Sequence, residues 1–283
     1  MPSAGFADLH LHTSCSDSTL SPAELVRQAH EVGLQTIAIT DHDCLDGIAP
    51  AAQAAHDLSL RIIPGVEMTA YFRDYEIHVV GLFIDPQHHE LVRELAALRS
   101  TRRERIRIIA ERLQLLGLSV DPEEIYHRAH GNSIGRAHVA QALLRRGYVE
   151  SLREAFERYI GDGGPAYVPK PKWSIQKAVG LIRSAGGLAV LAHPGNYNLD
   201  PLLPLFIAEF DAIEVFCPLH TQPQVDRYNF LAANFRLGIS GGSDDHGEAK
   251  DQRLLGQVKL PAALVDALAA RLSKGHARFA APQ

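Results

Sequence analysis

The sequence predicts an α/β fold in which about seven strand–helix units close into a barrel, with a helical insertion in the middle of the chain. Short apolar runs alternate with helical patterns, and polar side chains recur where the runs end. With 283 residues, the chain is long enough for one large domain or two smaller ones. Its 46% hydrophobic and 22% charged residues are typical of a folded globular protein.

The barrel is predicted from strands at both ends of the chain. These strands are expected at Phe6–Leu11, Thr36–Thr40, Arg61–Val66, Ile77–Phe83, Leu188–Ala192, Ala212–Phe216 and Leu237–Ser240. After the first strand, Ser21 and Glu24 form a capping-box pattern around Pro22, which predicts a helix that ends near Gly33. Strands that are separated by helices favour βα units, so we expect a parallel sheet.

The insertion is predicted at roughly 100–167, between barrel segments 1–99 and 168–283, because no strand pattern interrupts its helical spacing. Four helices are expected there: one over Leu91–Leu116 that stops at Gly117, one that opens at Asp121-Pro122, one over Ile134–Arg146, and one capped at Ser151 and closed by Gly161. The chain then returns to extended structure through a glycine-rich stretch.

Composition excludes several classes of protein. Three cysteines without CxxC spacing, Cys15, Cys44 and Cys217, do not form a disulfide framework or a structural zinc knuckle. Asp8 and His10 interrupt any apolar run of a signal peptide, and no segment approaches the ~20 apolar residues of a membrane span. We therefore expect a cytoplasmic protein without a membrane partner, and no motif indicates a protein partner. The net charge of −5 argues against general polyanion binding.

Side chains with metal-binding chemistry accompany the predicted strands. Asp8, His10 and His12 alternate with Leu9 and Leu11, so on a strand the three polar side chains share one face. Asp17 lies in the loop that follows, and His78 lies on the fourth predicted strand. The other candidates lie at or after later strand ends: Asp41, His42, Asp43, Glu67, His193, Asp244, Asp245 and His246. Because the carboxyl ends of barrel strands converge on one rim, we expect these residues to meet in one site.

The ligand chemistry favours manganese, iron or zinc, since it combines imidazole and carboxylate groups without thiolate. Several such cations held close together polarise a phosphoryl group and activate water, so hydrolysis needs no side-chain nucleophile. In agreement, the sequence has neither a GxSxG motif nor a P-loop. A packing or surface role is the commoner explanation for one histidine, but the recurrence at strand ends favours a polynuclear site.

Five segments resemble motifs of the PHP (polymerase and histidinol phosphatase) phosphoesterases. They are Asp8-Leu9-His10-Leu11-His12, Thr40-Asp41-His42-Asp43, Gly65-Val66-Glu67, Ala192-His193-Pro194 and Gly242-Ser243-Asp244-Asp245-His246. The resemblance implies a distorted (β/α)7 barrel with a trinuclear site, often containing manganese. It implies three ligand sets: His10, His12, Glu67 and Asp244; Asp17, His42 and His246; and Glu67, His78 and His193, with Glu67 bridging. Some members have a histidine at the position of Asp17.

Within this family, the insertion is similar to that of the 3',5'-nucleoside bisphosphate phosphatases. The matching segments are 101–106 and 132–138. That subgroup removes the 3'-phosphate from adenosine 3',5'-bisphosphate, and relatives trim short RNA from its 5' end. The resemblance thus implies a nucleoside bisphosphate substrate, with short RNA as a further one.

Basic residues of the insertion support this interpretation. Arg99, Arg102 and Arg103 share one helical face, and guanidinium groups bind phosphate bidentately. Arg136 is expected just inside a helix start, where backbone N–H groups attract anions. The predicted phosphate-binding residues are Arg102, Arg103, Arg105, Ser133 and Arg136. The alternative is an ordinary solvated basic helix face.

The sequence therefore predicts a metal-dependent phosphomonoesterase that converts adenosine 3',5'-bisphosphate to AMP. The predicted catalytic side chains are Asp43, Asp245 and His246, and the sequence does not choose which group protonates the leaving oxygen. Three alternatives stay open: a phosphatase for a small metabolite such as histidinol phosphate, a 5'→3' exonuclease on short RNA, and a non-catalytic metal-binding module.

Overall fold

The computed structural model describes residues 5–128, 134–249 and 253–275. The chain divides into two compact units. One unit combines Met1–Val92 with Trp173–Gln283 and contains the sheet; the other is the helical unit Arg93–Lys172. The predicted insertion falls inside this helical unit.

Within the described residues, eight strands form one sheet in the order β7-β6-β5-β4-β3-β2-β1-β8. The strands are β1 Phe6–Leu11, β2 Thr36–Ile39, β3 Arg61–Phe72, β4 Tyr75–Leu82, β5 Leu188–Leu191, β6 Ala212–Phe216, β7 Gly238–Gly241 and β8 Leu260–Pro261. Leu11 of β1 forms an isolated parallel bridge with Asp245, which follows β7, so the curved sheet almost closes. The predicted α/β barrel-like fold is confirmed.

The expected parallel arrangement is wrong at two strands. The pairs β3–β4, β4–β5 and β1–β8 are antiparallel, whereas the other neighbours are parallel. β3 extends to Phe72, beyond the predicted end at Val66, and a turn at Arg73 and Asp74 leads directly into β4. A connection of two residues can join only antiparallel strands, so this pair is a hairpin and not a βα unit.

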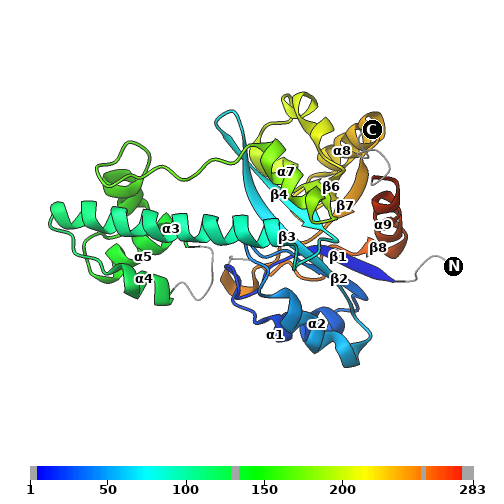
Figure 1. Cartoon of the computed structure of the whole chain (residues 1–283), viewed down its shortest axis with the longest axis horizontal. Coiled ribbons are helices and arrows are strands. Elements are labelled where there is room, and N and C mark those ends of the chain that lie inside the picture. Colours follow the sequence, from blue (N-terminus) through cyan, green and yellow to red (C-terminus); the bar gives the residue numbers. More distant parts are fainter. Residues whose placement is uncertain (1–4, 129–133, 250–252, 276–283) are drawn as a thin grey trace. The chain divides into compact units, whose positions relative to one another are not determined.

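Helices of this unit lie around the sheet. They are α1 Pro22–Glu31, α2 Ile48–Ala55, α7 Ile175–Ser184, α8 Gln222–Phe235 and α9 Ala262–Gly275. Figure 1 shows α1 and α2 beside β1 and β2, and α7 and α8 beside β4 and β6. The predicted cap of α1 is present: the Ser21 hydroxyl accepts a hydrogen bond from the Glu24 N–H, and the Glu24 carboxylate accepts one from the Ser21 N–H at 2.9 Å.

A bulge in β1 separates side chains that strict alternation would place together. The pairing register with β2 shifts between Asp8 and Leu11. As a result, Leu9 packs in a cluster with residues of the other strands and α9, whereas Leu11 packs in the layer of α1 and α2. The prediction that Leu9 and Leu11 share one face is therefore wrong, because a bulge adds a residue and re-aims the side chains around it.

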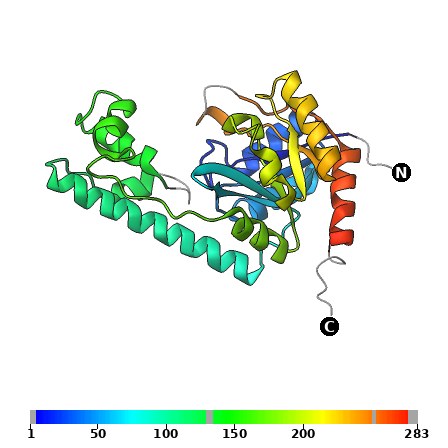
Figure 2. The same cartoon turned by 90° about the horizontal axis from the view of Figure 1, so that it is seen from above.

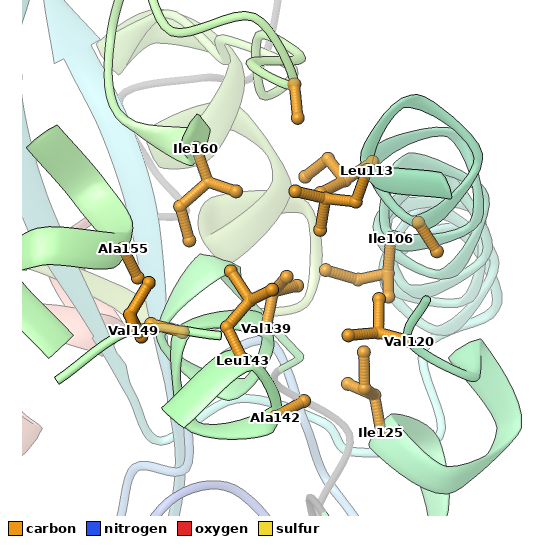
Figure 3. Close-up of a cluster of buried hydrophobic side chains, with 14 of the residues drawn as sticks. Ile106, Leu113, Val120, Ile125, Val139, Ala142, Leu143, Val149, Ala155 and Ile160 are labelled. Atoms are coloured by element: carbon orange, nitrogen blue, oxygen red, sulfur yellow. The ribbon is translucent and has the colours of Figure 1, made fainter. Parts of the chain in front are cut away.

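The helical unit has a hydrophobic core of its own. Its helices are α3 His89–Leu115, α4 Pro122–Arg128, α5 Arg136–Arg145 and α6 Leu152–Ala155, which continues as a π-helical turn. α3 is one uninterrupted helix (Figure 2). Figure 3 shows Ile106, Leu113, Val139 and Leu143 among the side chains that meet inside this unit. The four predicted helices are present; α5 begins at Arg136, later than predicted.

None of the helices in the described part of the chain is long and apolar enough to span a lipid bilayer.

Candidate metal centre

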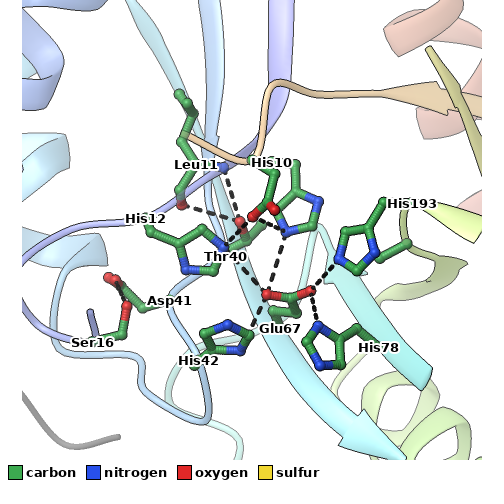
Figure 4. Close-up of polar contacts among 12 residues, drawn as sticks. His10, Leu11, His12, Ser16, Thr40, Asp41, His42, Glu67, His78 and His193 are labelled. Carbon is green, nitrogen blue, oxygen red and sulfur yellow. Dashed lines mark hydrogen bonds and ion pairs between the residues drawn. The ribbon is translucent and has the colours of Figure 1, made fainter. Parts of the chain in front are cut away.

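Glu67 is a fully buried carboxylate in the middle of β3, not at its end as predicted. Five imidazoles surround it (Figure 4). From Glu67 Oε2 the nearest nitrogens are Nε2 of His10 at 3.4 Å, Nε2 of His12 at 3.2 Å and Nδ1 of His42 at 3.1 Å; from Oε1 they are Nδ1 of His78 at 2.8 Å and Nε2 of His193 at 3.1 Å. The chain thus gathers groups from four strands around one carboxylate.

Strand pairing explains why distant residues converge. His10 and His12 stand at the carboxyl end of β1, and His42 follows β2 and forms a parallel bridge with Glu67. The backbone N–H of His12 also donates to the Asp245 carbonyl at 3.2 Å, which links β1 to the segment after β7. Except for β4, these strands present the same end to the site, as the sequence predicted for a barrel.

Three groups of side chains have ligand atoms within 4.8 Å of one another. They are His12, Asp17, His42 and His246; His10, Glu67, His193 and Asp244; and His42, Glu67 and His78. All nine predicted metal ligands occur in these groups. The grouping differs in detail from the predicted sets, because His12 lies with Asp17 and His193 lies with His10.

The charges of this cluster depend on one another. Burial opposes ionisation of Glu67, but the surrounding imidazoles, His42 and His78 foremost, hold its pKa well below the usual range. Burial alone would lower the pKa of His12, yet the carboxylates of Asp244 and Glu67 raise it to about 10. In the same way, Glu67 outweighs burial and raises the pKa of His78 to about 9. Positive charge at these positions therefore stabilises the buried carboxylates, and either protons or divalent cations can supply it.

The donor set fits divalent cations. Nε2 of His10, both ring nitrogens of His12 and Oε2 of Glu67 are buried without a well-formed hydrogen bond among the described residues. Buried polar atoms of this kind are rare unless a ligand satisfies them. Neutral imidazole and carboxylate are ligands of manganese, iron and zinc, and Glu67 belongs to two of the three groups, so it would help to hold two cations. The three groups consequently fit a multinuclear metal centre.

A family model described as the PHP domain matches residues 8–162, more than half of the chain. The chain belongs to the PHP family. It is accordingly a metal-dependent phosphoesterase, and the predicted resemblance is confirmed.

Three known proteins match this chain over most of their length. The 5'-3' exoribonuclease Rnm of Escherichia coli strain K12 is 39% identical over 248 residues, which are 84% of each chain. The 3',5'-nucleoside bisphosphate phosphatase of Chromobacterium violaceum is 34% identical over 259 residues, 89% of this chain and 91% of the relative. A crystal structure of a Bifidobacterium adolescentis protein superimposes with a TM-score of 0.80 at 30% identity and covers 96% of this chain and 98% of the other.

Two loops of the PHP centre are held by buried carboxylates that bind backbone. Asp41 accepts hydrogen bonds from the Thr13 N–H and the Thr13 and Ser16 hydroxyls, at 2.7, 2.7 and 2.5 Å. These contacts shape the loop that carries Asp17. Asp8 accepts from the N–H groups of His10 and Ser243, at 3.2 and 2.9 Å. Asp8, which the strand pattern placed among the metal-capable groups, belongs to none of the three ligand groups.

The predicted catalytic residues occupy different environments. Asp245 is fully buried and accepts three backbone hydrogen bonds, from Gly247 at 3.0 Å, Leu254 at 2.7 Å and Leu255 at 3.1 Å. This is the contact pattern of a carboxylate that shapes a loop. Asp43 is also fully buried and has a φ of 50°. His246 lies in a ligand group, with Nε2 3.3 Å from Asp17 Oδ1.

The predicted phosphate-binding residues belong to the helical unit, except that Ser133 lies outside the described residues. Arg136 donates to Asp162 at 2.7 Å and to the Ile160 carbonyl at 3.2 Å, and its guanidinium lies over the rings of Phe156 and Tyr167. Arg136 is thus partly engaged in holding the helical unit together.

The three predicted phosphate-binding arginines of α3 differ in exposure. Arg105 is only 7% exposed and donates to the Val168 carbonyl at 2.7 Å, which is a structural contact within the helical unit. Arg103 is exposed, and its guanidinium lies 4.8 Å from the centre of the Tyr126 ring. Arg102 is half-buried. Arg103 is accordingly the most accessible of the three.

Sequence reasoning missed Glu214 and Tyr197. Glu214, on β6, contacts Nδ1 of His10 at 3.2 Å. The Tyr197 hydroxyl accepts from the His78 N–H and donates to the Ala192 carbonyl, both at 2.9 Å. One signal was available for Glu214, since it is the only charged residue in the apolar run Ala212–Phe216. Tyr197 follows a strand end by several residues, and nothing in its spacing marks it.

Proposed function

We propose that this protein removes the 3'-phosphate from nucleoside 3',5'-bisphosphates, with adenosine 3',5'-bisphosphate as a substrate and manganese as the metal. The single observation that carries the proposal is the set of three ligand groups around Glu67 in a chain that is 34% identical to a 3',5'-nucleoside bisphosphate phosphatase. Several cations so close together suit a reaction in which negative charge develops on phosphoryl oxygens.

Each of the three ligand groups would hold one cation. His10, Glu67, His193 and Asp244 would hold one cation, His12, Asp17, His42 and His246 a second, and His42, Glu67 and His78 a third. When bound, these cations polarise the phosphoryl group and lower the pKa of water. The buried Glu67 carboxylate contacts five imidazoles and holds them close together, so the ligands need not reorganise during the reaction.

A pocket opens beside the cluster within the sheet-containing unit. It has a volume of about 320 Å³. Its lining consists of His42, Glu67, Glu76, His78, His193, Asn196, Tyr197 and Asp244. The size is at the lower end of pockets that bind small molecules, which suits a phosphorylated sugar. Glu76, Asn196 and Tyr197 line the pocket without being in a ligand group, so they are candidates for contacts with the ribose.

The second phosphate of the substrate is assigned to basic side chains of the helical unit. Residues 93–172 contain fifteen Lys and Arg against ten Asp and Glu, a net charge of +5 in a chain whose total is −5. We propose that the second phosphate binds to Arg102, Arg103, Ser133 and Arg136. Arg105 is not among these residues, because its burial favours the structural role described above.

A second activity, 5'→3' trimming of short RNA, is favoured by the 39% identity to the 5'-3' exoribonuclease Rnm. The same metal centre suits both reactions, since each cleaves a phosphoester beside a nucleoside. A short oligonucleotide is the expected polymer substrate. The net charge of −5 disfavours long polymers, whose binding needs many phosphate contacts.

The proposed function is tested by phosphate release from manganese-loaded protein. The substrates are adenosine 3',5'-bisphosphate, 3'-AMP, 5'-AMP and histidinol phosphate at equal concentration, with Asp244→Asn as the inactive control. We expect the bisphosphate to have the highest kcat/KM. Preference for histidinol phosphate would favour the metabolite phosphatase instead, and no turnover of any ester would favour the metal-binding module.

The anchor role is tested separately with Arg136→Ala. We expect a higher KM for adenosine 3',5'-bisphosphate and an unchanged KM for 3'-AMP, which lacks the 5'-phosphate. Arg153→Ala is the matched control, because Arg153 is an exposed arginine of the same unit that pairs with Glu157. An equal change for both substrates would indicate a structural effect, and no change would contradict the anchor role.

A further inference from the structure

Glu214 is a buried carboxylate in the middle of β6, and it belongs to none of the three ligand groups. Its Oε1 and Oε2 lie 3.2 and 3.3 Å from Nδ1 of His10. Oε2 also accepts a hydrogen bond from the backbone N–H of His193 at 2.6 Å. One carboxylate therefore contacts two residues that come from different strand ends and lie in the same ligand group.

The contact with Glu214 determines which nitrogen of His10 faces the cluster. An ionised carboxylate can only accept hydrogen bonds, so Nδ1 of His10 carries the proton. The lone pair of the neutral ring is then at Nε2, which lies 3.4 Å from Glu67 Oε2 and 3.6 Å from Asp244 Oδ1. Imidazoles that bind metals commonly have their other nitrogen held by such an acceptor.

The contact with the backbone of His193 has a different consequence. His193 has φ 24° and ψ 59°, a conformation that non-glycine residues rarely adopt. Such a conformation persists only where the surroundings hold it. The short N–H bond to Glu214 is one restraint, and it leaves Nε2 of His193 at 3.1 Å from Glu67 Oε1.

We propose that Glu214 is a positioning residue of the metal centre, which sets the tautomer of His10 and the backbone of His193 and so prepares one ligand group for a divalent cation. The group is His10, Glu67, His193 and Asp244. The proposal concerns metal binding and does not depend on which phosphoester the protein hydrolyses.

The decisive variant is Glu214→Gln, which keeps the shape of the side chain but replaces one acceptor with an NH₂ donor. If the amide oxygen takes the place of Oε2, it still accepts from the His193 N–H, but the NH₂ group then lies at the Oε1 position, 3.2 Å from Nδ1 of His10, where it opposes the Nδ1 proton or moves it to Nε2. If the NH₂ group takes the place of Oε2, the His193 N–H loses its acceptor. We expect one class of Mn²⁺ sites to bind about 10–100-fold more weakly, as measured by titration calorimetry on metal-free protein.

A spectroscopic measurement reports the tautomer directly. In zinc-loaded, ¹⁵N-histidine-labelled protein, the Nδ1–H proton of His10 is expected as a hydrogen-bonded signal that Glu214→Gln shifts or removes. Glu214→Asp retains an acceptor-only group and is expected to recover part of the lost affinity. Circular dichroism of the metal-free variants confirms that each is folded.

Asp211→Asn is the matched control, because Asp211 immediately precedes β6, the strand that carries Glu214, and belongs to no ligand group. Its carboxylate pairs with Arg183 at 2.9 Å and accepts from the Ala189 N–H at 3.0 Å, and neither partner belongs to a ligand group. We expect this variant to bind Mn²⁺ as the parent protein does. Unchanged affinity of every site in Glu214→Gln, equal weakening in both variants, or no recovery in Glu214→Asp would each overturn the proposal.

Discussion

Glu67 Oε1 lies 2.8 Å from His78 Nδ1, although the two residues are not directly paired across their strands. In the β3–β4 hairpin, Glu67 is opposite Val80 and His78 is opposite Thr69, so the carboxylate and the imidazole are diagonal neighbours on one face. A shift of register by one residue would turn His78 to the other face of the sheet. The metal centre therefore depends on the register of the β3–β4 hairpin.

Glu67→Gln tests the central role of this carboxylate. The variant removes a negative charge that five imidazoles approach, and its amide offers an NH₂ group where cations need an acceptor. We expect manganese binding to be lost at more than one site and kcat to fall by at least about 10²-fold. Calorimetry and phosphate release measure the two effects.

Glu76→Gln is the control for this prediction. Glu76 is also close to His78, at 3.7 Å, but its side chain is 42% exposed. Exposed ion pairs contribute only about 0.2–1 kcal/mol, so metal affinity should change by no more than about fivefold. Comparable losses of metal binding in both variants would contradict the central position of Glu67.

Much of the metal centre could be predicted because its ligands stand beside strands with clear apolar patterns. His10, His42 and His193 could be predicted as ligands from the rule that parallel strands of a barrel end on one rim. The hairpin was harder, since its turn at Arg73 and Asp74 lacks the Asn-Gly or Asp-Gly pair that usually marks two-residue turns. Arg73 has a φ of 56°, a conformation that its residue type does not suggest.

Other features of the fold depend on tertiary contacts that leave little trace in the sequence. β8 has two residues and exists through its pairing with Phe6 and Ala7 of β1. The bulge in β1 follows no glycine, so the alternation around Leu9 and Leu11 looked regular. Glu214 is identifiable in retrospect, because a charged residue inside an apolar strand must find a buried partner.

Manganese binding should release protons. In the metal-free protein, the neighbouring carboxylates outweigh burial and raise the pKa of His12 to about 10 and that of His78 to about 9. Both rings are then charged near neutral pH, whereas a cation binds neutral imidazole, so binding must displace these protons. Affinity should rise with pH up to these pKa values, by about tenfold per pH unit for each proton released.

Calorimetry in buffers with different ionisation enthalpies counts the released protons. The measurements are made at pH about 6.5 and pH about 8. Both lie below the raised pKa values of His12 and His78, where the affinity for manganese depends most steeply on pH. His78→Gln should release about one proton fewer than the parent protein. An affinity that does not change with pH, or falls as pH rises, would show that the imidazoles are already neutral.

Removal of the cations should destabilise the fold. The metal centre connects β1, β2, β3 and the segment after β7, so cations that bind only the folded state stabilise it. At a metal concentration of 100 times Kd, one site contributes about 2.7 kcal/mol. Scanning fluorimetry should show a Tm several degrees lower in EDTA than in manganese, and equal Tm values would mean that the sites are weak or empty.

Asp245→Asn distinguishes a loop-shaping carboxylate from a general acid. Asp245 accepts N–H groups of Gly247, Leu254 and Leu255, and asparagine would turn an NH₂ group towards at least one of them. Each buried donor left without an acceptor costs about 1–3 kcal/mol, so we expect a lower Tm. The pH profile of kcat should keep its shape, because the loop role involves no proton transfer. A profile that loses its alkaline limb, at an unchanged Tm, would instead identify Asp245 as the acid that protonates the leaving oxygen.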